Sequence, residues 1–121
     1  MEKSEITALF KQWNSALKTG DPKQVAALYA ADAILLPTVS NQVRHNHAEI
    51  EDYFVHFLAK GQQGKIDESN VRIFGELAIN SGGYTFTFKD GITVQARFTY
   101  VYRWDGQRWS IIEHHSSAMP E

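Results

Sequence analysis

The sequence predicts an α+β fold in which three helices from the N-terminal half pack on one face of a curved antiparallel sheet. Two observations support this prediction. Apolar residues recur at the spacing of one helical face in the first half of the chain, whereas beyond it their period changes to two. Glycine-containing pairs that favour tight hairpins also punctuate the second half. The length of 121 residues suits one domain, with boundaries at 1–121.

Two helices are predicted to open the chain. Ser4 precedes the first apolar face and suits an N-cap, and Gly20 suits a left-handed C-cap. Asp21 then caps a short second helix, with Pro22 at its first position and Gln24 closing a capping box. The apolar face of the first helix comprises Ile6, Leu9, Phe10, Trp13, Ala16 and Leu17. The inward residues of the second are Val25, Leu28 and Tyr29.

A brief apolar run between Asp32 and Pro37 has the length and boundaries of a strand. Asn46 and Glu49 then form the capping box of a third helix, which is predicted to end at Gly61. One face of this helix is markedly aromatic, and its members are Ile50, Tyr53, Phe54, Phe57 and Leu58.

The rest of the chain is predicted to form a meander of four antiparallel strands joined by hairpins. The turn signals are Ser81–Gly83, Asp90–Gly91 and Asp105–Gly106. The strands that these signals separate are expected at 66–79, 83–89, 92–104 and 107–117.

Composition limits the partners that the chain is expected to bind. A formal net charge of −2 and a pI near 6.2 provide no positive surface for nucleic acid or an anionic membrane. The chain has no cysteine, which excludes disulfides and thiolate metal sites. No apolar run reaches the length of a membrane span and the N-terminus lacks an apolar signal core, so a cytoplasmic location is expected.

The two segments TGDPKQVAALYAADAILLPT and VYRWDGQRWSIIEHHSSAMP, in this order of elements, resemble the nuclear transport factor two-like (SnoaL-like) superfamily. Within it the ending, above all HHSSAMP, is most similar to bacterial relatives of the calcium/calmodulin-dependent protein kinase II association domain. The resemblance implies a cone-shaped half-barrel with a pocket between the sheet and the third helix. It also implies assembly through the sheet, into a homodimer or a larger oligomer.

Arg97 is the first candidate for a ligand contact. It stands in the middle of the predicted strand 92–104 between apolar neighbours, where a guanidinium must be solvated, paired or used to hold an anion. The resemblance implies a pocket for small carboxylates, because the kinase association domain has an arginine-lined pocket. The family's arginine before the terminal serine is replaced here by His115, and a salt bridge at a sheet or subunit interface is the alternative role for Arg97.

The last predicted strand carries the candidates for proton transfer. Neighbouring strand residues point to opposite faces, so only one of His114 and His115 can face the pocket. The alternation that places His115 with Trp109, Ile111 and Glu113 leads us to expect His115 inside, with His114 as the alternative. Glu113 is a third candidate, as an orienting carboxylate or a base.

Trp13, Tyr53 and Tyr100 are expected to line the pocket, since aromatic walls with a few polar groups are typical of small-molecule sites. No histidine or carboxylate has the spacing of a metal site, and no cofactor is predicted. Three functions remain open at this stage. They are a homodimer that binds a small molecule, an isomerase, cyclase or dehydratase that uses a pocket histidine, and a purely structural oligomerisation module.

Overall fold

The computed structural model describes residues 2–38, 42–59, 61 and 63–118. Its helices are α1 (Lys3–Thr19), α2 (Pro22–Ala26) and α3 (His47–Leu58). Its strands are β1 (Tyr29–Leu36), β2 (Gln63–Phe74), β3 (Leu77–Thr87), β4 (Thr93–Trp104) and β5 (Trp109–Ala118). The α+β fold with a curved, unclosed sheet is confirmed.

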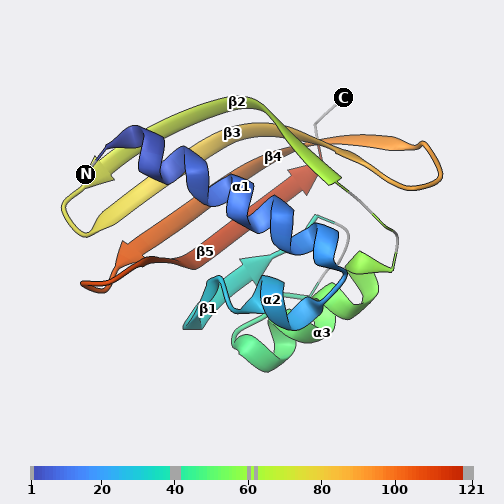
Figure 1. Ribbon diagram of the computed structural model, residues 1–121, viewed down its shortest axis with the longest axis horizontal. Coiled ribbons are helices and arrows are strands. Elements are labelled where there is room, and N and C mark those ends of the chain that lie inside the picture. The colour runs from blue at the N-terminus through green and yellow to red at the C-terminus, as the bar shows by residue number, and fades with distance from the viewer. Residues whose placement is uncertain (1, 39–41, 60, 62, 119–121) are drawn as a thin grey trace.

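The five strands form one sheet in the order β1-β5-β4-β3-β2. Strands β2 to β5 are an antiparallel meander, as predicted, and β1 joins the end of the sheet parallel to β5. The long strands curve around α1, which lies along one face, while α2 and α3 gather beside β1 (Figure 1). This arrangement leaves the opposite face of the meander without helices.

The helix ends follow the sequence signals with small differences. The N-cap of helix α1 is two residues earlier than predicted, because Glu2 and Glu5 form the capping box and Ser4 lies inside the first turn. Gly20 adopts the expected left-handed conformation, with φ of 72°. Asp21 and Asn46 cap α2 and α3 as predicted, each accepting a hydrogen bond from a backbone N–H of the first turn.

Two details of these caps differ from the prediction. The Glu49 carboxylate accepts from the N–H of His45, at 2.8 Å, one residue before the expected partner. Helix α2 also ends at Ala26, so Tyr29 belongs to β1 and not to the helix. The bond predicted from Gln24 back to Asp21 is not among those of the described residues, where Asp21 Oδ1 accepts from the N–H of Lys23.

The first hairpin of the meander was predicted at Ser81–Gly83, and this prediction is wrong. The turn lies at Gly75, whose φ is 61°, and residues 81–83 run through the middle of β3. Gly82 is needed there for a close approach, since a Cβ on it would lie 2.0 Å from the carbonyl oxygen of Glu68. The pairing of β2 with β3 shifts register at this place, between Ile66 and Glu68.

The other two turn signals are confirmed. Gly91 and Gly106 both have positive φ, at 89° and 102°, and connect the remaining strands of the meander.

Aromatic side chains dominate the core between the helices and the sheet. The largest fully buried side chains include Trp13, Tyr29, Tyr84, Tyr100, Tyr102 and Phe54. Four polar residues are buried with them, namely Asn80, Ser110, His114 and Ser116. Because buried polar groups need hydrogen-bond partners, these residues mark the places where the core is not purely apolar. Within the described ranges, no helix is long and apolar enough to cross a membrane.

Candidate functional site

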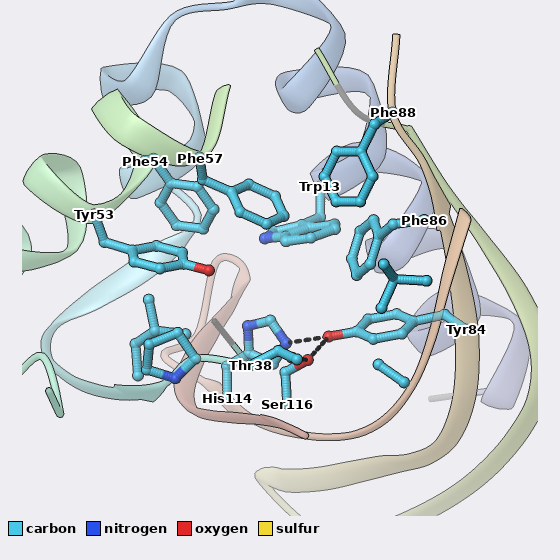
Figure 2. Close-up of a pocket in the computed structure, with 14 residues that line it drawn as sticks. Trp13, Thr38, Tyr53, Phe54, Phe57, Tyr84, Phe86, Phe88, His114 and Ser116 are labelled. Atoms are coloured by element: carbon cyan, nitrogen blue, oxygen red, sulfur yellow. Dashed lines mark hydrogen bonds between the residues drawn. The ribbon is translucent and has the colours of Figure 1, made fainter. Parts of the chain in front are cut away.

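A cavity opens between α3, α1 and the helix-covered face of the meander (Figure 2). The space between these side chains, counted together with open solvent at the mouth, is about 450 Å³, of which about 30 Å³ admits the centre of a water molecule. The lining residues come from every layer of the fold: Trp13, Leu35, Pro37, Thr38, Tyr53, Phe54, Phe57, Tyr84, Phe86, Phe88, Val94, Ala96, His114 and Ser116. The site therefore depends on the complete arrangement of helices and strands.

The described residues that line this cavity are mostly aromatic, and none of them carries a formal charge. None of the 14 lining residues is Asp, Glu, Lys or Arg. Rings from α1, α3 and β3 surround the space, and the hydroxyl of Tyr53 points into it (Figure 2). That hydroxyl has no hydrogen-bond partner among the described residues, although the Tyr53 ring stacks on Phe57 and lies under the guanidinium of Arg44. Such a cavity suits a flat apolar molecule more than an ion.

A chain of hydrogen bonds forms the polar floor of the cavity. Trp13 Nε1 donates to Tyr29 Oη at 3.1 Å, and Tyr29 Oη lies 2.8 Å from His114 Nδ1. His114 Nε2 lies 3.2 Å from Tyr84 Oη, which donates to Ser116 Oγ at 2.6 Å. The last link joins Ser116 Oγ to Thr38 Oγ1. Six side chains from α1, from strands β1, β3 and β5 and from the segment after β1 are thus connected.

His114 at the centre of this chain is held in its neutral form. Burial lowers the pKa of His114 from 6.5 to about 3, and the neighbouring His115 contributes in the same direction. Burial raises the pKa values of Tyr29 and Tyr84 above the usual value of 10.0. None of these three groups carries a charge near neutral pH.

The prediction that His115 faces the pocket is wrong. His114 is 3% exposed and lines the cavity, whereas His115 is exposed on the outer face. The cause is a register shift in the pairing of β4 with β5, where Val101 faces Glu113 but Tyr102 faces Ile111. The extra residue, Ile112, reverses the alternation, so that Trp109 and Ile111 share the inner face with His114.

Arg97 and Glu113 also lie away from the cavity. Both are exposed, and their cross-strand partners are Gly83 and Ser117 for Arg97 and Val101 for Glu113. Arg97 is on the face of β4 opposite Ala96 and Phe98, which are buried. The expected carboxylate contact therefore has no place in this cavity, and the acid-base candidate moves from His115 to His114.

The remaining candidates are divided between the cavity and the core. Trp13 and Tyr53 line the cavity, as expected from the aromatic pattern. Tyr100 lies outside the lining and stacks against the ring of His114, with 4.0 Å between the ring centroids. Sequence reasoning missed Thr38, Tyr84 and Ser116. The parity of strand 92–104 placed Ala96 and Tyr100 on one face, but no signal linked Thr38 to Ser116, which are distant in sequence.

Metal binding has no support in the described part of the chain, where no three His, Cys, Asp or Glu side chains are arranged to hold an ion.

Comparison with known families gives a match over residues 2–120 to the model of the calcium/calmodulin-dependent protein kinase II association domain. The chain belongs to this family. A solved structure of a proposed association domain protein from Xanthomonas campestris has 51% sequence identity and a TM-score of 0.96. That alignment covers 100% of this chain and 90% of the other. Curated proteins yield no match.

More distant structures share the fold of this association domain. A proposed dehydratase of the NTF2-like family from Streptomyces avermitilis is 16% identical, with a TM-score of 0.86 over 98% of this chain and 96% of the other. An NTF2-like protein of unknown function from Pseudomonas putida KT2440 is 21% identical, with the same TM-score, over 98% and 87% of the two chains. At these identities the likeness concerns the fold alone.

Proposed function

We propose that this association domain binds an uncharged small molecule in the cavity between α3 and the meander, and that it does so as a homodimer. The observation that supports binding is the composition of the cavity, whose described lining combines aromatic walls, hydroxyls at the floor and no formally charged side chain. Binding sites for small molecules commonly combine an apolar lining with a few oriented polar groups.

The hydroxyl of Tyr53 distinguishes a binding site from an ordinary packed core. It points into the cavity without a hydrogen-bond partner among the described residues, although Tyr53 is only 7% exposed. The hydroxyls of Tyr100 and Tyr102 also lack a partner among the described residues, but they are buried in the core, whereas the Tyr53 hydroxyl faces the cavity, where a ligand can accept its hydrogen.

Binding explains His114 better than acid-base catalysis does. Both of its ring nitrogens already have hydrogen-bond partners, Tyr29 and Tyr84. A base with a pKa of about 3 is weak near neutral pH, where an efficient proton acceptor needs a pKa close to the pH of the solution. These contacts support a role for His114 in organising the floor of the cavity.

Self-association is proposed through the face of the meander that carries no helix. Apolar side chains pair on this face at Phe74–Leu77 and at Ile79–Val101, and these four residues form the apolar stripe. Phe74 and Leu77 are 60% and 42% exposed and lie opposite each other in the sheet. Contiguous exposed apolar surface of this kind marks interaction sites, and the family is one of association domains.

Titration with a flat aromatic probe tests the binding proposal. Ethylbenzene or acetophenone is added to the 15N-labelled protein, and amide shifts are followed by NMR. We expect shifts at residues around the cavity and their loss in Val94→Phe, which fills the space. Thr93→Phe is the matched control, because Thr93 is exposed on the other face of the same strand. Shifts confined to residues away from the cavity, or retained in Val94→Phe, would contradict the proposal.

A further inference from the structure

We propose that the hydrogen bonds from Trp13 to Thr38 run in one direction, so that the Thr38 hydroxyl is a donor toward the cavity and selects uncharged ligands with an acceptor oxygen. This inference rests on the binding function proposed above and adds the class of ligand to it.

Trp13 sets the direction at the buried end. An indole N–H donates and cannot accept, so Tyr29 Oη must accept the bond from Trp13 Nε1. The hydroxyl hydrogen of Tyr29 then has His114 Nδ1, 2.8 Å away, as its acceptor. Tyr29 is completely buried. If His114 Nδ1 donated to Tyr29 Oη instead, the hydroxyl hydrogen of Tyr29 would have no acceptor among the described residues.

The tautomer of His114 follows from this bond. In the neutral ring one nitrogen accepts and the other carries the hydrogen. Because Nδ1 accepts from Tyr29, the hydrogen lies on Nε2 and is donated to Tyr84 Oη. The ring is enclosed by Trp13 and Tyr100, with centroid distances of 5.7 Å and 4.0 Å, so it cannot rotate freely to another arrangement.

The same order of donor and acceptor continues from Tyr84 to the cavity. Tyr84 Oη has accepted from His114 and donates to Ser116 Oγ at 2.6 Å. Ser116 donates in turn to Thr38 Oγ1, which lies within hydrogen-bonding distance. Thr38 has no other hydrogen-bond partner among the described residues, and its oxygen is already an acceptor. Its hydrogen is therefore free for a ligand.

Thr38 and Tyr53 thus offer two hydroxyl hydrogens to one aromatic cavity. A ligand that matches them has a flat apolar body and a carbonyl or similar acceptor oxygen. A carboxylate would lose its hydration without meeting a cation among the described lining residues, and its desolvation costs more free energy than that of a neutral acceptor. A ligand without an acceptor would leave both hydroxyls unpaired.

Three probes of similar size separate these classes: acetophenone with a neutral acceptor, ethylbenzene without an acceptor, and benzoate with a charge. Dissociation constants are measured by NMR titration of the wild-type protein, Thr38→Val and Thr38→Ser. We expect acetophenone to bind about fivefold more tightly than ethylbenzene, with benzoate the weakest. Thr38→Val should reduce the preference for acetophenone, because only the Tyr53 hydroxyl remains as a donor, and should leave ethylbenzene unchanged. Thr38→Ser should restore the wild-type preference.

The outcomes distinguish this inference from the function on which it rests. If acetophenone and ethylbenzene bind equally, or Thr38→Val keeps the full wild-type preference, the assigned direction is wrong and the binding function stands. Tighter binding of benzoate than of acetophenone overturns the ligand class. If no probe perturbs residues around the cavity, the binding function fails and this inference fails with it.

The tautomer of His114 tests the direction without a ligand. Nitrogen-15 NMR of the histidine side chains distinguishes a protonated from an unprotonated ring nitrogen. We expect Nδ1 of His114 to be unprotonated and Nε2 to carry the hydrogen in the free wild-type protein. In Trp13→Phe, which lacks the donor that sets the direction, the fraction of the other tautomer should rise. A wild-type ring with its hydrogen on Nδ1 overturns the proposal.

Discussion

The imidazole of His114 stacks on the phenol ring of Tyr100, with 4.0 Å between the centroids and 18° between the planes. Tyr29 and Tyr84 occupy the two nitrogens of the same imidazole. The ring is therefore covered on one face and at both polar positions, and water cannot stabilise a charge on it. Protonation of His114 would place an unpaired cation inside the core.

The first prediction concerns stability in acid. The pKa of His114 is about 3 in the folded protein and 6.5 in the unfolded chain, so the unfolded chain binds the extra proton between these values. The stabilisation that comes from keeping His114 neutral is fully present above the pKa of the unfolded chain. It is lost as the pH falls toward the pKa of His114 in the folded protein. At about 1.4 kcal/mol per pKa unit, lowering the pH from about 7 to about 5 should cost about 2 kcal/mol.

Urea unfolding of the wild-type protein, His114→Gln and His115→Gln measures this contribution. In His114→Gln the free energy of unfolding should fall less between the two pH values, because the buried proton site is gone. His115→Gln is the matched control and should keep the wild-type dependence, since His115 is exposed. Equal pH dependence in all three proteins would show that His114 is accessible to protons in the folded state.

The second prediction concerns the close approach of β2 and β3. A Cβ at Gly82 would lie 2.0 Å from the carbonyl oxygen of Glu68, whereas at Gly83 the nearest atom outside its own neighbours is 3.5 Å away. Gly82→Ala should therefore lower the free energy of unfolding by about 1–3 kcal/mol, as overpacking does elsewhere. Gly83→Ala should change it by less than about 1 kcal/mol. Similar values for the two variants would mean that the strands can separate here without cost.

The same two glycines show where prediction from sequence was limited. The signal Ser81–Gly83 has the composition of a turn, yet the chain uses Gly82 for contact between strands and turns at Gly75. A glycine fits both a turn and a close contact between strands. Which of these roles it has depends on the pairing with the neighbouring strand. The caps at Gly20, Asp21 and Asn46 were predictable because their signals act within one turn of the residue itself, whereas Glu2 and not Ser4 caps α1.

The candidate site was less predictable for a related reason. The alternation of β5 would place His115 inside if the strand were regular, and one extra residue at Ile112 reverses that result. A bulge depends on the pairing of two strands, so it leaves no clear mark in the sequence of one. The contact of Thr38 with Ser116 depends on how β1 and the segment after it reach β5.

The third prediction concerns self-association. Val101 lies near the middle of the apolar stripe on the outer face, opposite Ile79. In Val101→Asp a charge would be buried without a partner in the interface, and the affinity between subunits should fall at least about tenfold. Sedimentation or light scattering at micromolar concentration measures the mass.

The control for this variant is Val55→Asp, which adds the same charge to an exposed residue on α3. Val55 is 51% exposed and lies away from the outer face of the sheet, so this variant should keep the wild-type mass. A monomeric wild-type protein would contradict self-association itself. An unchanged mass for Val101→Asp would move the interface to another surface.

The last prediction separates stability from binding at Tyr53. Its hydroxyl has no partner among the described residues, so Tyr53→Phe should leave the free energy of unfolding unchanged or raise it by up to about 1 kcal/mol. The same variant should weaken binding of acetophenone, because it removes a donor from the cavity. Tyr84→Phe is the matched comparison: its hydroxyl bonds to Ser116 and His114, and its loss should destabilise the protein by about 1–3 kcal/mol. Chemical unfolding and NMR titration of both variants measure the two effects. A destabilised Tyr53→Phe with unchanged acetophenone affinity would assign the hydroxyl to the folded structure alone, since a group kept for a ligand costs stability in the free protein and contributes only when the ligand is bound.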